Sequence, residues 1–600
     1  MRFRVEPASR HNLQLGRGCG PVRERNSMSQ KLVERLQQEF GSAILGTDSS
    51  HGDESVTVAP DRLLDVLGHL RDREGCEQLS DVVGVDYPDR KERFDVVYLL
   101  RSWCNNHRVQ VKVGVAEDAA VPSAHGIYRS ADWAEREVYD LYGIPFAGHP
   151  DLRRILCHHE FEGHALRKDY PIEQGQECSR PEHLFTDEDI VAAAARANAI
   201  DSDPLGPMDE VHPSDLLTVN LGPSHPAMHG ALRAEVLLDG ETIVEARTEI
   251  GYIHRCFEKE AEDHTWAQVM PYTDRLNYCS AMLNNSIYAM AVEKLIGVEA
   301  TPRTQAIRVI VSELSRIIDH LVCICANLVD VGALTNYWYL YNVRESIYET
   351  LEKLCGSRLT TNYARIGGMS HDLYDGFADE VRVKLDEMVA GNTDVMKLIA
   401  RNRIFLDRTV GVGVISREDA LSAGYTGPCL RATGLAHDLR KHAPYSGYEN
   451  YEFDIPTGTD GDTHDRVMVR MAEMVQSRSI VLQALETLPD GPLNIDNHDV
   501  VLPPKQQVYG SIEGVMNQFK LVSEGIPVPA GEAYGFGEGA NGELGYYCIS
   551  DGSGRPYRLK VRPPCFSIFA SYAWLVRGGM IPDAIATLGS LNIIAGELDR

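Results

Sequence analysis

The sequence predicts an α+β protein: a small N-terminal α/β domain, then a mainly α-helical bundle domain with a small β-sheet at its start. Residues 108–115 alternate apolar and polar side chains, as a half-buried strand does. Residues 301–328 repeat apolar side chains with the 3.6-residue period of a helix. Residues 216–247 form short β-type runs around an Asp-Gly pair, which is a strong hairpin signal.

Length and charge exclude several classes of protein. A chain of 600 residues exceeds one hydrophobic core, so we expect two or more domains. The net charge of -28 disfavours nucleic acid as a partner and direct docking on anionic lipid. The longest apolar segments, such as 321–326 and 572–576, are far shorter than the roughly 18 residues that span a bilayer. We therefore predict no transmembrane segment.

The cysteines predict neither a disulfide framework nor an iron–sulfur site. Their number, 13, is odd, and no CxxC pair occurs. Reduced thiols in a cytosolic compartment fit this pattern better. Because there is no ferredoxin-type cysteine run, any electron carrier is expected in another chain.

The first domain is expected over residues 28–171. Residues 1–27 carry scattered arginines with little apolar patterning, so we interpret them as a disordered or misassigned start in preference to a transit peptide. The expected elements are helices at 31–40, 60–73 and 131–142 and strands at 93–102 and 108–115. The last helix is rich in charge. It is interpreted either as a face that docks on a partner or as a salt-bridged surface helix.

The segment His158-His159-Glu160-Phe161-Glu162-Gly163-His164 invites a zinc interpretation. A zincin needs HExxH, which places two histidines one helical turn apart. The interval here is one residue longer, and Gly163 disfavours a helix. We therefore expect no metal at this segment.

Residues 172–212 are predicted to be a linker between the domains. They are polar and acidic, contain three prolines, and include one short Ala-rich helix at 187–198. The second domain is expected over residues 213–600. Its first strand, 216–221, leads into the loop 222–230, which carries two histidines and is followed by strands at 231–238 and 242–247.

This loop and two later segments contain several polar side chains that could take part in catalysis. His225 and His229 lie on the loop, Arg255 follows in Gly-Tyr-Ile-His-Arg, and Tyr278 ends Pro-Tyr-Thr-Asp-Arg-Leu-Asn-Tyr. Rigid scaffolds often present catalytic side chains on such loops at the end of a sheet. These side chains suit proton transfer and polar recognition.

The rest of the second domain is predicted to be mostly helical. Helices are expected at 274–296, 301–328, 343–355, 376–389, 465–488 and 505–522, with a β-hairpin over 543–558. Asp330 interrupts an apolar run; it is either paired in the interior or a helix-end acid in solvent. The glycine-rich segments lack the strand–GxGxxG–helix and GxxxxGK[ST] contexts, so we do not expect this chain to bind NADH.

Several long motifs resemble a known family. Residues 135–171 resemble the signature of the C-type subunit of respiratory complex I. Residues 213–600 resemble its D-type subunit, which is similar to the large subunit of [NiFe]-hydrogenases. The match covers nearly everything from Met28 onward. The whole is similar to the fused C/D subunit of bacterial proton-translocating NADH:quinone oxidoreductase.

The resemblance implies a peripheral membrane protein on the cytoplasmic side of the bacterial inner membrane. Its expected partners are a B-type subunit with the terminal [4Fe–4S] cluster, other peripheral-arm subunits and the membrane H-type subunit. The expected substrate is a quinone, reduced with electrons from NADH and coupled to proton translocation. No covalently bound cofactor, FMN or NAD is expected on this chain. An assembly or scaffold subunit of a related complex with another electron donor is the alternative.

The resemblance also assigns site residues. His229, from GPxHPxxHG, and Tyr278, from PYxDRxxY, would hydrogen-bond the two quinone carbonyls. Asp330, from DxGAL, would hold the His229 imidazole. Arg255 would lie beside the partner's cluster. His225 is included in the site, but a structural role on the loop backbone is preferred to a catalytic one.

Two departures qualify the resemblance. Cys256 stands where family members usually have glycine, and Thr360 stands where a histidine associated with proton-coupled tuning of the cluster is often found. Such coupling is therefore doubtful, which is compatible with a lower-potential quinone.

A hydrogenase needs four cysteines as two CxxC pairs for nickel and iron. The corresponding positions are Asn277, Ser280, Ile594 and Glu597, so hydrogenase chemistry is excluded.

Overall fold

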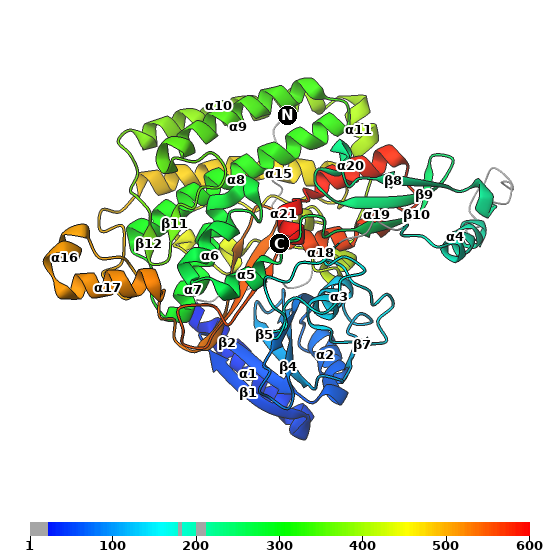
Figure 1. The fold of residues 1–600 in the computed structure, drawn as a ribbon. Helices are drawn as coiled ribbons and strands as arrows, with labels where there is room; N and C mark the ends of the chain where they lie inside the picture. The colour runs from blue at the N-terminus through cyan, green and yellow to red at the C-terminus, as the bar shows by residue number, and fades with distance from the viewer. Residues whose placement is uncertain (1–21, 178–182, 200–211) are drawn as a thin grey trace.

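The first part of the chain is built on a five-stranded sheet with the strand order β1-β2-β5-β4-β3 (Figure 1). β2 and β5 pair in parallel and the other neighbours pair antiparallel. The structure is a computed structural model that describes residues 22–177, 183–199 and 212–600. The bounds are α1 Val22–Phe40, β1 Ile44–Ser50, β2 Asp53–Val58, α2 Leu63–Asp72, β3 Gln78–Asp86, β4 Phe94–Arg101, β5 Arg108–Val115, β6 Val121–Pro122, α3 Ala131–Tyr142 and β7 Phe146–Ala147.

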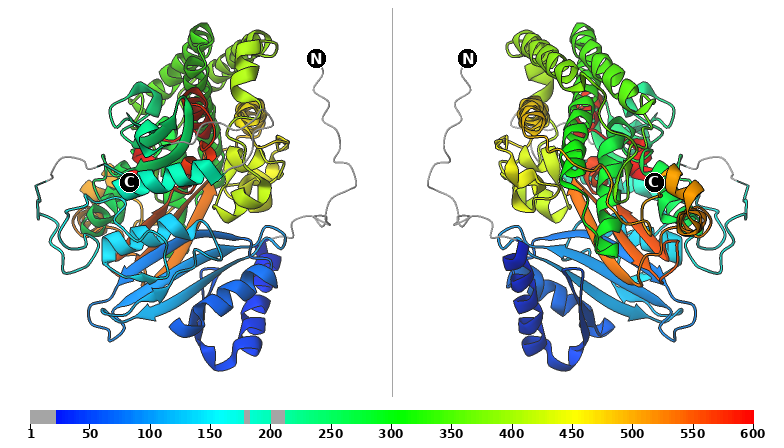
Figure 2. Two further views of the ribbon diagram at one scale, coloured as in Figure 1. Left: turned by 90° about the vertical axis from the view of Figure 1, so that its right-hand side faces the viewer. Right: turned by 90° about the vertical axis from the view of Figure 1, so that its left-hand side faces the viewer.

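Both faces of this sheet are covered. On one face, side chains such as Val111 pack with Leu36 of α1 and Leu67 of α2. On the other face, Val83 and Val97 pack against a second sheet from the end of the chain, β13 Gly531–Glu538, β14 Glu543–Ser550 and β15 Arg558–Arg562. Figure 2 shows these late strands reaching the first sheet. The two ends of the sequence therefore share one interior.

The second part opens with the predicted three-stranded sheet. Its order is β10-β9-β8, with β8 Leu217–Leu221, β9 Arg233–Asp239 and β10 Thr242–Glu249. Asp239 pairs with Thr242 across the Asp-Gly turn, which confirms the hairpin. The Ala-rich helix is also confirmed as α4, Asp187–Ala199, and it contacts β10.

Helix α8, Pro302–Asp330, is the central element of the helical bundle. Thr301 caps its N-terminus by accepting a hydrogen bond from the backbone N–H of Thr304. Its predicted apolar stripe is confirmed, since Ile310, Leu314 and Leu321 are buried. It packs against α7 Ala281–Ile296, α9 Leu334–Cys355, α15 Thr463–Glu486 and α20 Ile581–Leu591. Among the residues that the structure describes, no helix is both long and apolar enough to span a membrane.

The remaining helices are shorter or lie at the edge of the bundle. They are α5 Phe257–Asp263, α6 Trp266–Thr273, α10 Phe377–Ile399, α11 Arg403–Thr409, α12 Arg417–Ser422, α13 Gly427–Arg431, α14 Leu439–His442, α16 Lys505–Gly510, α17 Ile512–Ser523, α18 Pro564–Ala570, α19 Tyr572–Leu575 and α21 Ala595–Asp599. A two-stranded ribbon joins β11 Ala364–Arg365 to β12 Gly368–Met369.

Several predicted boundaries were wrong. The helix expected over 274–296 begins only at Ala281, because the Asn277 side chain accepts the Cys279 N–H and holds the preceding residues in a 3-10 turn. The helix expected over 505–522 is divided at Ser511, whose side chain caps α17. Helix α1 begins at Val22, nine residues before the expected start; of the predicted irregular segment, residues 1–21 lie outside the described residues.

Both sequence-based interpretations of α3 were wrong. It is neither a docking face nor a solvated surface helix, because Glu135, Glu137 and Asp140 are all buried. Their partners come from elsewhere in the chain. Glu137 contacts Lys560 of β15 at 2.5 Å, and Asp140 accepts backbone N–H groups of residues 155–157. Helix α3 is therefore a charged element inside the protein.

Candidate functional site

The histidine loop joins β8 to β9 at the edge of the small sheet. A one-turn 3-10 helix, Pro226–Met228, forms its centre. His225 precedes this turn and is exposed, and its Nδ1 accepts a hydrogen bond from the Ala227 N–H at 3.3 Å. His229 ends the turn with φ 55. The hydrogen bond to the loop backbone that is expected of His225 is present. His229 has a left-handed backbone conformation.

His229 meets Asp330, the last residue of α8. The His229 Nε2 lies 2.9 Å from Asp330 Oδ2, and the two side chains are only 17% and 10% exposed. Burial raises the pKa of Asp330, and the contact with His229 opposes this shift. The alternative of an acid in solvent is therefore wrong. Helix α20 closes this site from behind, because a Cβ at Gly589 would lie 2.6 Å from Asp330 Oδ2.

Tyr278 lies in the 3-10 turn that interrupts the predicted helix. Its side chain is 38% exposed. Burial of the phenol raises the pKa of Tyr278 to about 12, and nearby acidic groups, including Asp319, add to the shift. Because this value is far above neutrality, the hydroxyl is a proton-bearing hydrogen-bond donor at physiological pH.

The Ala595–Gly596 pair at the start of α21 joins the two segments. A Cβ at Gly230, beside His229, would lie 2.7 Å from Ala595 Cβ. A Cβ at Gly596 would lie 2.4 Å from the carbonyl oxygen of Arg275 and 3.5 Å from Tyr278 Cδ1. The histidine loop and the tyrosine turn therefore rest on adjacent residues of one short helix. No pattern in the sequence indicates this role of the C-terminal segment.

Residues 251–256 are held by the same C-terminal segment. Asp599 accepts the backbone N–H groups of Gly251 and Ile253, each at 2.9 Å, and the His254 Nδ1 lies 2.6 Å from the Asp599 carbonyl oxygen. Arg255 is exposed. Within the described ranges it forms no hydrogen bond or ion pair with His229 or Asp330, and its place beside a partner's cluster stays a prediction.

Cys256 has φ 53, in the left-handed region that glycine adopts without cost. This conformation is one that suits the glycine which the resemblance implies at this position. We predict that Cys256→Gly raises the free energy of unfolding by about 1 kcal/mol, because it removes that strain. The midpoint of thermal inactivation of the assembled complex should rise slightly. The matched variant Cys104→Gly, at an exposed cysteine, should show no rise; equal behaviour of the two variants would contradict the explanation.

The structure shows a polar cluster that sequence reasoning did not find. Asn277, beside Tyr278, donates a hydrogen bond to Asp319 of α8 at 2.6 Å. Cys565 donates to Glu597 of α21 at 2.8 Å. Asn277 and Glu597 were singled out only as positions where a hydrogenase has cysteine. Nothing in the local sequence distinguishes Asp319 or Cys565, because both act through contacts distant in sequence.

Two groups of side chains in the described part of the chain have metal-ligand spacing. His158, His159 and Glu160 place one ligand atom each within 4.8 Å of one another, as do Asp462, His464 and Asp465. His164, the other histidine of the zinc-like segment, instead places Nδ1 2.9 Å from the Asp140 carbonyl oxygen. Neither group includes a cysteine, so among the described residues no thiol set for an iron–sulfur cluster is assembled.

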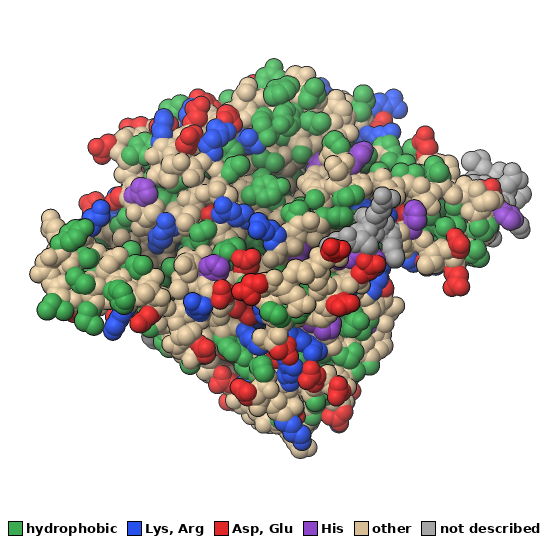
Figure 3. Space-filling model, viewed as in Figure 1, with side chains coloured by type: hydrophobic (Ala, Val, Ile, Leu, Met, Phe, Trp, Pro, Cys, Tyr) green, Lys and Arg blue, Asp and Glu red, His purple; other side chains and the backbone are tan. Residues whose placement is uncertain are grey.

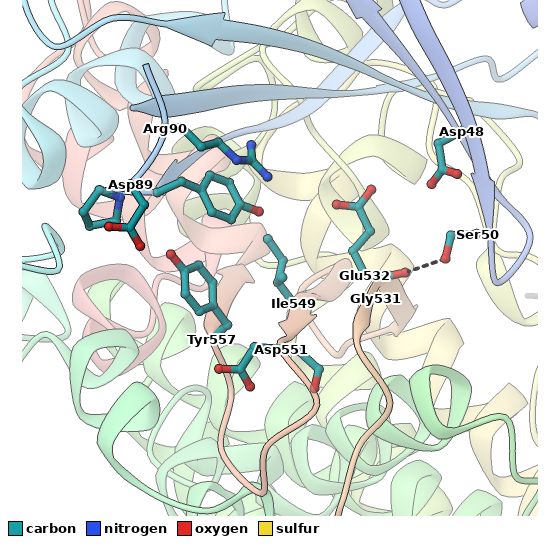
Figure 4. Close-up of a pocket in the computed structure, with 12 residues that line it drawn as sticks. Asp48, Ser50, Asp89, Arg90, Gly531, Glu532, Ile549, Asp551 and Tyr557 are labelled. Carbon is teal, nitrogen blue, oxygen red and sulfur yellow. Dashed lines mark hydrogen bonds between the residues drawn. The ribbon is translucent and has the colours of Figure 1, made fainter. Parts of the chain in front are cut away.

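A cavity of about 530 Å³ lies apart from these residues, at the junction of the two sheets (Figure 4). Tyr87 and Tyr557 stack in its wall with ring centroids 5.4 Å apart, and the Arg90 guanidinium lies 3.6 Å from the Tyr87 ring centre. Glu532 enters from β13 (Figure 4). The cavity shares no lining residue with the region of His229 and Tyr278.

Comparisons with known proteins match both parts of the chain. The family described as "Respiratory-chain NADH dehydrogenase, 49 Kd subunit" matches residues 330–600, and the corresponding 30 Kd subunit family matches residues 56–176. The NADH-quinone oxidoreductase C/D subunit of Bdellovibrio bacteriovorus is 49% identical over 551 residues, covering 92% of this chain and 95% of that protein. The NADH-quinone oxidoreductase D 1 subunit of Sorangium cellulosum is 52% identical over 389 residues, covering 65% of this chain and 96% of that protein. The D subunit of Geobacter sulfurreducens is 48% identical over 388 residues, covering 64% of this chain and 99% of that protein.

Proposed function

Because this chain belongs to the family of fused C/D subunits of NADH-quinone oxidoreductase and is a peripheral-arm subunit of complex I, we propose that its D-type part binds the quinone headgroup between His229 and Tyr278. The observation that carries the proposal is the His229–Asp330 contact at 2.9 Å. The shared support of the His229 and Tyr278 segments on Ala595–Gly596 adds to it. Residues 28–171 then form the C-type part, 172–212 the linker and 213–600 the D-type part.

The proposed site supplies both protons that quinone reduction takes up. A quinone accepts two electrons and two protons to become a quinol. Tyr278 donates a hydrogen bond and then a proton to one carbonyl oxygen, and His229 does the same at the other. Asp330 fixes the imidazole orientation through its contact with the His229 Nε2. The [4Fe–4S] cluster of the B-type partner would supply the electrons. Arg255 would lie beside that cluster, and His225 shapes the loop.

An exposed hydrophobic surface beside the site supports the proposal that a partner subunit covers it. Leu334, Trp338 and Tyr339 of α9 follow Asp330 closely in sequence and are 55%, 57% and 48% exposed. Figure 3 shows hydrophobic side chains gathered over the face where α8, α9 and α10 lie. We propose that the B-type and membrane H-type subunits close the site there, with this chain on the cytoplasmic side of the bacterial inner membrane.

The C-type part acts as a scaffold in this proposal. Its charged helix α3 is joined to the D-type part by ion pairs of Glu137 with Lys560 and Arg600. Its sheet packs on β13–β15 beneath the bundle. A purely structural role for the whole chain, the alternative, does not require the His229–Asp330 contact at 2.9 Å.

The test is Asp330→Asn in the assembled complex. We expect about tenfold slower quinone reduction, because a neutral amide replaces the carboxyl partner that positions the His229 imidazole for proton transfer. NADH oxidation with an artificial acceptor that bypasses the quinone should not change. Asp394→Asn, at an exposed acid of α10, is the control. A quinone reduction rate equal to that of the control would refute the proposed role of Asp330.

A further inference from the structure

Six polar side chains form a buried cluster behind Tyr278. None is more than 5% exposed, although they come from distant parts of the chain. They are Asn277, Asp319, Asn541, Cys565, Asn592 and Glu597. We call them the acid cluster.

Hydrogen bonds connect the acid cluster from one carboxyl group to the other. Asp319 accepts from Asn277 Nδ2 at one oxygen and from Asn592 Nδ2 at the other, each at 2.6 Å. Asn592 Nδ2 also donates to Asn541 Oδ1 at 2.5 Å, and Asn541 Nδ2 donates to Cys565 Sγ at 3.5 Å. Cys565 Sγ donates to Glu597 Oε2 at 2.8 Å. The two acids are thus linked through two side-chain amides and the Cys565 thiol.

Within the described ranges, neither Asp319 nor Glu597 forms an ion pair with a cation. The titratable and charged groups that face Asp319 are His320, Arg470, Tyr278, Cys279, Cys323, Tyr348, Cys565 and Glu597. Those that face Glu597 are Asp319, Cys565, Arg562 and Tyr546. Burial raises the pKa of Asp319, and it raises the pKa of Glu597 to about 7 with a further contribution from Asp319. Both shifts favour the protonated acids, and the repulsion of like charges disfavours ionisation of both at once.

The acid cluster is adjacent to the phenol in two ways. Asn277 directly precedes Tyr278, and Gly596, which packs on the Tyr278 ring, directly precedes Glu597. The negative charge of Asp319 also helps to raise the pKa of Tyr278. The charge of the acid cluster therefore acts on the hydroxyl group at the proposed quinone site.

We propose that Asp319 and Glu597 hold one dissociable proton between them, and that the charge of this pair sets how readily Tyr278 gives its proton to the quinone; this rests on the quinone site proposed above. Tyr278 and protonated His229 each lose one proton as the quinone gains two electrons and two protons. Solvent then returns a proton to each. When the pair loses its own proton, its second negative charge opposes formation of the Tyr278 phenolate. Quinone reduction should therefore slow as pH rises through the titration of the pair.

The first experiment measures kcat for quinone reduction by the assembled complex from pH 6 to pH 8.5. We expect kcat of the unmodified complex to fall about fivefold across this range, and that of Glu597→Gln to change less than about twofold. Glu135→Gln is the matched control. Burial also raises the pKa of Glu135 to about 7, but its carboxylate contacts are Ser123 and Ala124 in the C-type part. Superimposable profiles for all three proteins would overturn the proposal.

A second pair of variants leaves both acids in place. Cys565→Ser gives Glu597 a stronger donor, which stabilises the ionised carboxylate and moves the alkaline decline to lower pH. Cys565→Ala removes the donor and moves the decline to higher pH. Shifts of about half a pH unit or more in opposite directions support the proposal even if Glu597→Gln fails to assemble; no shift, or shifts in the same direction, overturns it.

Failure of the acid-pair proposal can be distinguished from failure of the proposed quinone site. If Tyr278→Phe retains full quinone reduction, the site is not at Tyr278, and both proposals fall. If Tyr278→Phe is inactive with quinone while the Glu597 and Cys565 variants keep the unmodified pH profile, only the role of the acid pair is lost.

Discussion

Replacing Tyr278 by phenylalanine is expected to slow quinone reduction by the assembled complex about 100-fold, because the site loses a hydrogen-bond and proton donor to the developing negative charge. The rate of NADH oxidation with an artificial acceptor that bypasses the quinone should be unchanged. Because the pKa of Tyr278 is raised to about 12, the phenol stays protonated between pH 6 and pH 9 and can act as a donor throughout that range.

The structure makes this substitution a clean probe. Among the described residues, the Tyr278 hydroxyl forms no hydrogen bond with another group of the chain, so phenylalanine removes nothing that the fold uses. The ring contact with Gly596 is retained. The control is Tyr509→Phe, at a tyrosine that is 88% exposed on α16. Equal quinone reduction by the two variants would show that Tyr278 serves packing alone. Loss of both the quinone and the artificial-acceptor rates would instead indicate failed assembly.

The long helices could be predicted because their signal is local. The apolar stripe of α8 repeats every 3.6 residues, and nearly all of it is buried. Strand β13 carries no such signal, since it reads Gly-Glu-Ala-Tyr-Gly-Phe-Gly-Glu. Glycine is unfavourable in strands unless another backbone approaches closely. That is its use here, because a Cβ at Gly535 would lie 2.3 Å from Ala291 Cβ of α7.

The candidate site likewise contains contacts that could be predicted and contacts that could not. The resemblance paired His229 with Asp330, and the structure places their side-chain atoms 2.9 Å apart. Their assigned roles in quinone reduction stay predictions. Asp319 could not be found from sequence, because its partners Asn277 and Asn592 are 42 and 273 residues away along the chain. The burial of Glu137 was missed for the same reason: its partners Lys560 and Arg600 are 423 and 463 residues distant.

Replacing Glu137 by glutamine is expected to lower the free energy of unfolding by about 3–5 kcal/mol, which is the usual cost of removing one partner from a buried ion pair. Glu137 contacts Lys560 and Arg600, and all three side chains are at most 3% exposed. A neutral amide leaves these cations with less compensation in an interior where water cannot solvate them. The measurement is the yield of assembled complex together with its midpoint of thermal inactivation.

Glu137, Lys560 and Arg600 form an ion cluster with Glu258, which lies 3.5 Å from Arg600. The pKa of Glu258 makes the stability of this cluster depend on pH in acid. Burial alone would raise the pKa of Glu258, but Arg558, Lys560 and Arg600 outweigh it and leave the value at about 2, against 4.5 for a free glutamate. A depressed pKa contributes stability that is present above pH 4.5 and is lost as pH falls towards 2.

The control for Glu137→Gln is Glu345→Gln, at a side chain that is 41% exposed and pairs with Arg358; it should cost less than about 1 kcal/mol. If Glu137→Gln were no more destabilising than this control, the ion cluster would not be what joins the C-type part to the D-type part.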